Sequence, residues 1–111
     1  MLSKVTAPFR AQPALPNSSH LSRDMGWTSL TFDVHEPSTA IFVEVQGQAQ
    51  FDAADIVCSD GEIVSLPLRN SVRGQGMFAL HDLGATKTVE QVRITARARS
   101  PQARVGLRLG L

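Results

Sequence analysis

The amino-acid sequence predicts an all-β fold, an antiparallel β-sandwich of jelly-roll or immunoglobulin-like type, with about seven or eight short strands behind an extended N-terminal arm. Three observations support this prediction. Apolar and basic side chains alternate with a period of two near the C-terminus, turn signals recur about every eight to twelve residues, and no segment shows a convincing helical stripe of apolar residues. A period of two is typical of strands because successive side chains point to opposite faces of the sheet.

Length and composition indicate a single globular domain. A chain of 111 residues has room for one hydrophobic core. Its 42% apolar and 19% charged residues are typical of a globular protein rather than a disordered one. No apolar run approaches the roughly 18 residues that a membrane-spanning helix needs. Cys58 is the only cysteine, which excludes an internal disulfide and any cysteine-rich zinc site.

Residues 1–25 are predicted to form the arm, and residues 26–111 the β-sandwich domain. The first 21 residues contain three prolines, two basic residues and no acidic residue, and they show no sustained periodicity. We expect such a segment to be held by a groove of its own domain or by a neighbouring subunit. It lacks the apolar core of a secretory signal, so the expected location is the cytoplasm.

The first two predicted strands lie on either side of a turn. Residues 27–34 form one strand, and residues 41–46 form the next, with apolar side chains at alternate positions. Between them, residues 35–38 contain Pro37 and small polar side chains, which are typical of a turn.

A hairpin and a glycine loop organise the middle of the chain. Residues 55–58 and 62–68 flank Ser59-Asp60-Gly61, and an Asp-Gly pair between two apolar strands is among the strongest short hairpin signals. Residues 52–57 are also compatible with one short helical turn. A glycine loop at 73–76 then precedes a strand at 77–83, and residues 84–88 form another predicted turn.

The C-terminal segment is predicted to form a hairpin with one apolar face and one arginine face. The side chains predicted to point inward are Val92, Ile94, Ala96, Ala98, Ala103, Val105, Leu107 and Leu109. Ser100-Pro101-Gln102 would connect the two strands. The rest of the core is expected to come from Trp27, Leu30, Phe32, Phe42 or its neighbours, Phe51, Ile56, Ile63, Leu66, Phe78 and Leu80.

Positive charge is concentrated at the C-terminal end. Residues 90–111 contain five arginines and one acidic residue, a net charge of +4, whereas residues 1–89 have a net charge of −3. The predicted binding residues are therefore Arg93, Arg97, Arg99, Arg104 and Arg108. Such a face attracts nucleic acid, acidic lipid, acidic glycan or an acidic protein. The alternative is that the arginine stems simply cover the outer sheet face while their charged ends stay hydrated.

Other candidate chemistry has a simpler structural explanation. Cys58 lies in an apolar strand with no adjacent basic residue, so we expect a buried side chain rather than a nucleophile. His20, His35 and His81 show no metal-ligand spacing. The carboxylates Asp52, Asp55, Asp60, Glu62 and Asp82 raise a calcium hypothesis, but no calcium-loop motif is present. No catalytic residue, metal site or cofactor is predicted.

Several short motifs follow one another across residues 40–110. In chain order they are Asp60-Gly61-Glu62, Leu66-Pro67-Leu68-Arg69, Gly74-Gln75-Gly76, Asp82-Leu83-Gly84, and the segments 89–92 and 99–105. This order resembles a family of small bacterial all-β proteins known only as a domain of unknown function. The chain departs from the family in placing His81 before Asp82 and in lacking an exported leader. The resemblance implies a sandwich fold and an envelope location, and it supplies no catalytic residue.

Two functions are compatible with these observations. The first is a non-enzymatic structural or protein-interaction module that assembles, with another protein or with itself, through its arm and sheet edges. The alternative is a polyanion-binding protein that uses the five C-terminal arginines.

Overall fold

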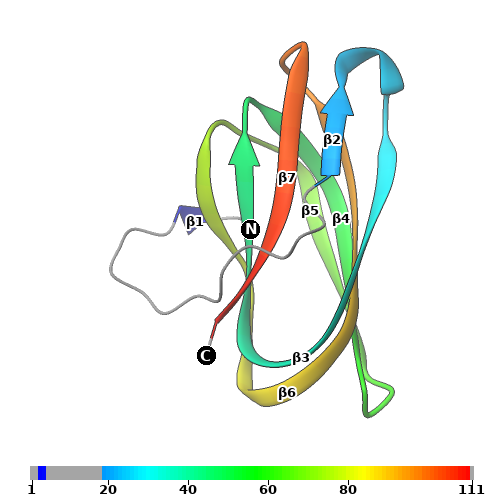
Figure 1. Cartoon of the computed structure of the whole chain (residues 1–111), viewed down its shortest axis with the longest axis vertical. Helices are drawn as coiled ribbons and strands as arrows, with labels where there is room; N and C mark the ends of the chain where they lie inside the picture. Colours follow the sequence, from blue (N-terminus) through cyan, green and yellow to red (C-terminus); the bar gives the residue numbers. More distant parts are fainter. Residues whose placement is uncertain (1–2, 5–18, 111) are drawn as a thin grey trace.

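The structure, a computed structural model, describes residues 3–4 and 19–110 (Figure 1). The strands are β1 (Ser3–Lys4), β2 (Ser19–Ser22), β3 (Thr28–Gln46), β4 (Ala49–Cys58), β5 (Ile63–Arg73), β6 (Gly76–Ala98) and β7 (Gln102–Gly110), and the 3₁₀ helix η1 (Arg23–Met25) follows β2. Every strand pairing is antiparallel. The predicted all-β, antiparallel class is confirmed.

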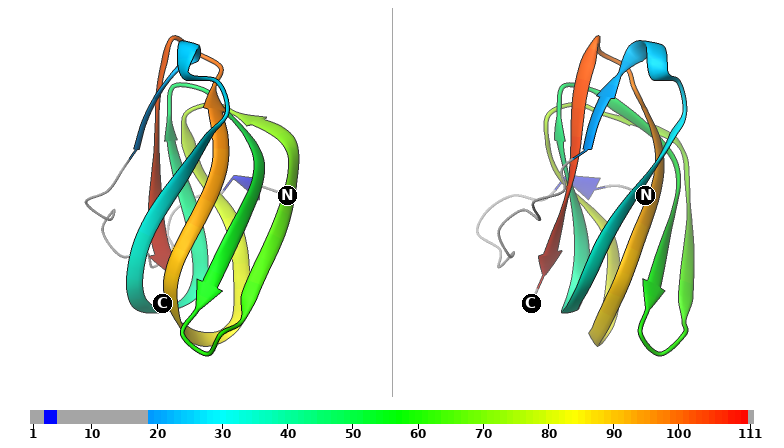
Figure 2. Two further views of the ribbon diagram at one scale, coloured as in Figure 1. Left: turned by 90° about the vertical axis from the view of Figure 1, so that its right-hand side faces the viewer. Right: turned by 45° about the vertical axis from the view of Figure 1, so that its right-hand side comes forward.

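One sheet contains all of these strands, in the order β2-β7-β3-β6-β4-β5, with β1 attached to β6. The two longest strands, β3 and β6, run down one side of the molecule, bend together and return on the other side (Figures 1 and 2). The bend divides the sheet into two parts. The first half-sheet consists of residues 28–34, residues 89–98, β4 and β5, and the second consists of β1, residues 76–82, residues 40–46, β7 and β2.

The bend replaces two predicted turns. Residues 35–38 and 84–88 are not loops, because β3 and β6 continue through them while paired to each other. The register between the two strands shifts on both sides of residues 36–38, and His35 and Gly84 adopt positive φ angles of 52° and 75°. Irregularities of this kind increase strand twist and bend a sheet. The proline and glycine signals are real, but they mark a bend in two paired strands.

The core lies where the inner faces of the two half-sheets meet. One cluster of buried side chains includes members of both, such as Ile56 and Ile94 from the first and Val43 and Leu107 from the second. All eight inward positions predicted from the C-terminal alternation are buried. For the prediction of Phe42 or its neighbours, the neighbours Ile41 and Val43 are buried and Phe42 is partly buried. Leu66 is also only partly buried.

Two predicted core residues are wrong. Trp27 is 43% exposed and Ile63 is 59% exposed. Trp27 immediately precedes β3, and its position is out of phase with the buried side chains of Leu30 and Phe32 in that strand. Ile63 pairs with Val57 on the outer face, and its neighbour Val64 points toward the core instead.

The predicted C-terminal hairpin is also wrong. β6 pairs with β1, β3 and β4, whereas β7 pairs with β2 and β3, so β6 and β7 do not pair with each other. The connection through Ser100-Pro101 carries the chain from the first half-sheet to the second. In both strands the side chains predicted to point inward are buried. The outward side chains of β6 residues 92–98 and of β7, however, lie on different faces of the molecule.

The middle of the chain largely follows the prediction. β4 and β5 form the expected hairpin, in which the amide of Glu62 donates to the Asp60 carboxylate over 2.9 Å and Gly61 has a φ of 91°. The glycine loop separates β5 from β6, and Gly76 has a φ of 152°. Residues 52–57 lie in strand β4, so the alternative of a helical turn there is wrong.

Parts of the predicted arm pair with the sheet. β1 pairs with β6 at one edge of the second half-sheet, and β2 pairs with β7 at the opposite edge. Leu21 in β2 is fully buried in the core. The rest of the predicted arm, residues 1–2 and 5–18, lies outside the described residues, as does residue 111.

Candidate anion-binding cleft

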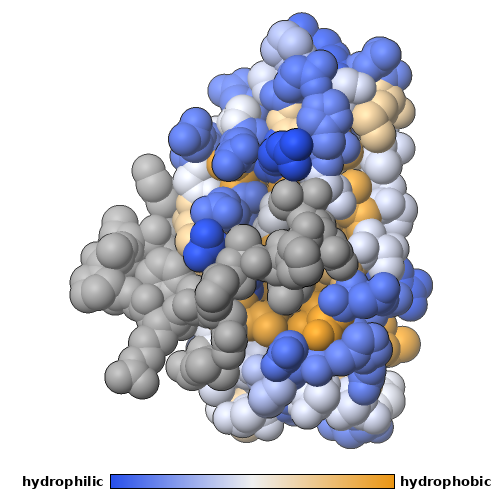
Figure 3. Space-filling view, in the orientation of Figure 1, coloured by the Kyte–Doolittle hydropathy of each residue, from blue (hydrophilic) through white to orange (hydrophobic). Residues whose placement is uncertain are grey.

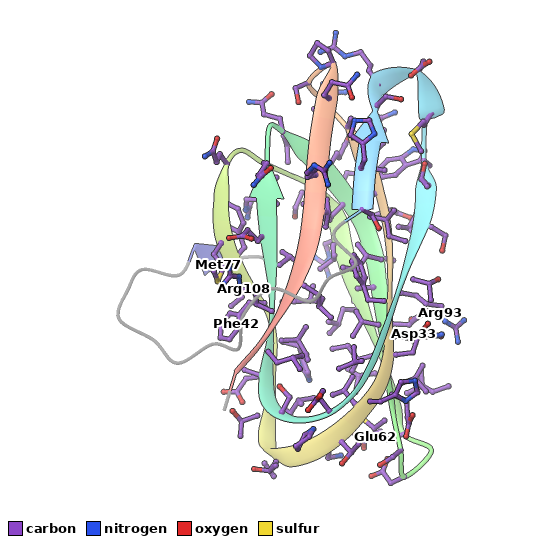
Figure 4. All side chains as sticks on the ribbon, viewed as in Figure 1. Asp33, Phe42, Glu62, Met77, Arg93 and Arg108 are labelled. Carbon is purple, nitrogen blue, oxygen red and sulfur yellow. The ribbon has the colours of Figure 1, made fainter. Side chains whose placement is uncertain are left out.

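The five predicted arginines do not form one surface. Arg93 lies on the outer face of the first half-sheet, in register with Thr31 on β3 and Asp55 on β4. Its Nε donates to the side chain of Gln91 over 3.0 Å, and Gln91 donates to Asp33 over 3.2 Å. Figure 4 shows Asp33 and Arg93 close together on one side of the molecule. Carboxylates on both neighbouring strands therefore offset the charge of Arg93 locally.

Arg108 lies on the opposite side of the molecule from Arg93, near Phe42 and Met77 (Figure 4). Its Nη2 is 3.4 and 3.3 Å from the two carboxylate oxygens of Glu44, and both side chains of this pair are partly buried. Arg108 is thus engaged in an ion pair within the second half-sheet. Arg104 is on the same half-sheet, in register with His20 on one side and Gln46 on the other.

Arg97 and Arg99 are brought together with a third arginine that was not among the predicted residues, Arg23 of η1. These three line an open cleft of about 320 Å³ together with Gly26 and Ala98. The cleft residues come from η1, from Gly26 and from the end of β6 and the residue that follows it. Figure 2 shows η1 beside the connection from β6 to β7. The lining of the cleft includes three arginines and no Asp or Glu residue.

One backbone and one side-chain hydrogen bond of Arg23 hold η1 at the cleft. The amide of Arg23 donates to the carbonyl of Pro101 over 3.2 Å, and its Nη2 donates to the carbonyl of Arg99 over 2.7 Å. The amide of Arg99 in turn donates to the carbonyl of Gln48 over 2.8 Å. These hydrogen bonds join the short helix to the β6–β7 connection, so they fix the backbone positions of Arg23 and Arg99 relative to each other.

Arg97 is oriented by two side chains. Its guanidinium group lies over the ring of Trp27 with 4.7 Å between the guanidinium carbon and the ring centroid, a cation–π contact. Its Nε donates to the side-chain oxygen of Gln50 over 2.8 Å, and Gln50 donates to the carbonyl of Asn70 over 3.2 Å. Among the described residues, the terminal nitrogens of Arg97 have no hydrogen-bond partner, so they are available to an anion.

One carboxylate lies near the cleft without lining it. Asp24 follows Arg23 in η1 and accepts a hydrogen bond from the hydroxyl of Ser22 over 2.6 Å. This hydrogen bond lowers the pKa of Asp24, so its negative charge persists at neutral pH. Asp24 is therefore an exposed negative charge on η1, next in sequence to Arg23 of the cleft.

Sequence reasoning missed Arg23 because it lies far from Arg97 along the chain, within the predicted arm. It also missed Trp27, which was assigned to the core. The sequence did indicate the outward position of Trp27, because position 27 is out of phase with the apolar positions 30 and 32 in a period-two pattern. No sequence signal placed η1 beside the end of β6, since that neighbourhood depends on the pairing of β2 with β7.

The remaining candidate groups serve structural roles. Cys58 is buried, as predicted, and burial raises the pKa of its thiol. His35 contacts Glu90 over 2.5 Å, and His20 contacts Gln102. Lys87 donates to Glu62 over 2.6 Å, which raises the pKa of the lysine. No three His, Cys, Asp or Glu side chains gather as a metal-ligand set within 3–4 and 19–110.

Strand β5 forms one end of the sheet and exposes apolar side chains. Ile63 near its start and Val72 near its end are 59% and 43% exposed. Between them the strand carries Pro67 and a bulge at which Arg69 and Asn70 have positive φ angles. Proline and bulges limit pairing with another strand at an edge.

Comparison with known proteins adds no family. No protein-family model matches the chain, and no curated protein matches it. No helix of the described residues is long and apolar enough to cross a membrane.

Proposed function

We propose that the chain is a non-enzymatic binding protein for an anionic partner and that its binding site is the cleft lined by Arg23, Arg97 and Arg99. The presence of three arginines in the lining of one cleft, with no acidic residue, is the observation that supports this proposal. Guanidinium groups present several N–H donors in a plane, which suits phosphate, sulfate and carboxylate oxygens. This function corresponds to the alternative function predicted from the sequence, polyanion binding, but with the binding site restricted to one end of the molecule.

Differences in local environment favour the cleft over the other arginines. Arg93 and Arg108 lie beside carboxylates, and the latter is 3.3 Å from Glu44. An incoming anion would have to compete with those carboxylates. In the cleft an anion meets no lining carboxylate, so electrostatic attraction is stronger there.

Retention on immobilised heparin tests this proposal with two variants of equal net charge. One replaces Arg23, Arg97 and Arg99 by glutamine, and its matched control replaces Arg93, Arg104 and Arg108 by glutamine. We expect the first variant to elute at a much lower salt concentration than the second, because binding through released counterions weakens with each lost contact. Thermal melts establish that both variants are folded. Equal elution of the two folded variants would refute the cleft as the site.

A protein-interaction function is the second candidate. The exposed side chains of Ile63 and Val72 on edge strand β5 favour it. A second copy of the chain or another protein would cover these side chains by packing against them, because Pro67 and the bulge limit the addition of a strand at this edge. The two functions are compatible, because β5 and the cleft involve different residues. Native mass measurement tests the protein-interaction function by comparing the wild type with a double variant that carries Ile63→Ser and Val72→Ser. This function predicts a larger assembly for the wild type only.

We also propose that the bent sheet be regarded as a β-sandwich. The support is the single core cluster, to which the inner faces of both half-sheets contribute. The jelly-roll or immunoglobulin-like type and the resemblance to the bacterial family stay predictions.

A further inference from the structure

We infer that the anionic partner is a lipid membrane surface and that the cleft docks on it end-on, with Met25 and Trp27 entering the interface between headgroups and acyl chains. This inference rests on the proposed function, since the three cleft arginines would bind the lipid phosphates. It adds the identity of the partner and the role of two exposed apolar side chains.

The first observation is the position of exposed apolar side chains. Four large hydrophobic residues of the described chain are exposed, and two of them, Met25 at 49% and Trp27 at 43%, flank Gly26 of the cleft lining. Apolar side chains beside a cationic cluster are not needed to bind a small soluble anion. They suit a membrane surface, where tryptophan is enriched at the headgroup level and apolar side chains gain by leaving water.

The second observation is the distribution of charge over the surface. The cleft arginines are confined to the end of the molecule that carries η1, an end that is mostly hydrophilic in Figure 3. The outer faces of the half-sheets place Asp33, Asp55 and Glu44 beside their arginines. A long polymer such as nucleic acid, lying along either face, would meet these acids. A flat anionic membrane that touches only the end of the molecule avoids them.

The third observation is that the docking elements are held in place before binding. η1 is tied to the β6–β7 connection through the two hydrogen bonds of Arg23, and the Trp27 ring is covered on one side by the Arg97 guanidinium group. Little conformational entropy is then lost when the end of the molecule meets a surface. The cation–π pair also lets Trp27 and Arg97 enter the interface together.

Vesicle binding tests the inference, because Trp27 is the only tryptophan and the chain has no tyrosine. The probes are vesicles of phosphatidylcholine alone and vesicles that also contain phosphatidylglycerol. We expect the fluorescence of Trp27 to shift to the blue, and the protein to sediment with the vesicles, only when phosphatidylglycerol is present. Each Arg→Gln change at positions 23, 97 and 99 should lower partitioning about fivefold, in line with the usual contribution of one basic residue near an anionic surface.

Met25→Ser examines the apolar contribution, and Met77→Ser is its matched control, since it makes the same change at a methionine outside both the cleft and β5. We expect Met25→Ser to reduce partitioning several-fold and Met77→Ser to leave it unchanged. Glycerol phosphate and a DNA duplex serve as soluble competitors and should displace the protein only at high concentration.

The outcomes separate the two proposals. If heparin retention depends on the cleft but neither sedimentation nor fluorescence changes with anionic vesicles, the membrane inference is overturned and the proposed function stands. Tighter binding of the DNA duplex than of the vesicles would also overturn the membrane inference. If heparin retention does not depend on the cleft, the proposed function fails, and the membrane inference fails with it.

Discussion

At the scale of residues, Arg97 is the member of the cleft whose surroundings are best defined. Trp27 supports one face of its guanidinium group, and Gln50 accepts from its Nε. These contacts use one face of the guanidinium group and its Nε, and Arg97 also lines the cleft. A lysine at this position keeps the charge but offers neither a planar group to stack nor two parallel donors.

Arg97→Lys should therefore weaken heparin binding several-fold without changing the melting temperature by more than a few degrees. Arg93→Lys is the matched control, because Arg93 also lies on β6 but outside the cleft. Salt-gradient elution and a thermal melt measure the two effects. Equal elution of the two variants would show that the geometry of Arg97 contributes nothing beyond its charge.

Asp24→Asn should have the opposite effect. The wild-type carboxylate is ionised at neutral pH, because the hydrogen bond from Ser22 lowers its pKa. Its removal takes away the one negative charge of η1, so retention on heparin should rise to a higher salt concentration. The same change at Asp52, which is exposed on β4, controls for net charge. A smaller gain from Asp24→Asn than from Asp52→Asn would contradict the placement of the site.

Cys58 provides a test of the core. Burial raises the pKa of its thiol above the ordinary value of 9.0, so the folded state favours the neutral form. The contribution of the neutral thiol to the free energy of unfolding is fully present below pH 9.0. It is lost as the pH rises through the higher pKa of the thiol in the folded state. Labelling with a thiol-specific disulfide reagent should be slow in the native protein at pH about 8 and fast in denaturant. Rapid native labelling would show that this strand end opens readily.

At the scale of elements, the bend in β3 and β6 is the feature that the sequence described least well. Period-two alternation placed the inward side chains correctly along 92–109, because each side chain in a strand responds to the polarity of its own face. Turn residues at 35–38 and 84–88 were recognised, but a local signal does not distinguish a loop from a bend in two paired strands. The same limit led to the β6–β7 hairpin, since pairing partners depend on the whole topology.

For the candidate site, too, local sequence signals predicted some residues, whereas others depended on the topology. Arg97 and Arg99 were predicted from alternation and local charge, whereas the contribution of Arg23 required the pairing of β2 with β7. The separation of Arg93 and Arg108 onto opposite faces also depended on topology rather than on local sequence.

Ser38 tests the bend directly. It is fully buried, and its hydroxyl lies 2.6 Å from the carbonyl of Ala40 and 3.0 Å from the carbonyl of Gly110, so it joins β3 to the end of β7. Ser38→Ala should lower the free energy of unfolding by about 1 to 2 kcal/mol, because buried carbonyl groups lose their donor. Ser29→Ala, at an exposed position of the same strand, should change it by less than about 0.5 kcal/mol. Denaturant unfolding measures both, and equal values would contradict the assigned role of Ser38.

At the scale of the whole molecule, the architecture sorts five similar arginines into different environments. The bent sheet sends Arg93 to one face and Arg108 to the other, each beside an acidic side chain, and leaves Arg97 and Arg99 at the end where η1 adds Arg23. In the described residues, the cleft therefore has three arginines and no lining carboxylate, whereas Arg93 and Arg108 lie beside acidic side chains. Binding is expected to be local and to depend strongly on salt.

Amide chemical-shift mapping of the isotope-labelled full chain, titrated with a short heparin oligosaccharide, tests the central claim most directly. The account predicts that the largest shift changes fall in residues 22–28 and 96–101, which surround the cleft. Changes centred instead on the sheet faces around Arg93, Arg104 and Arg108, or spread evenly over the chain, would contradict it.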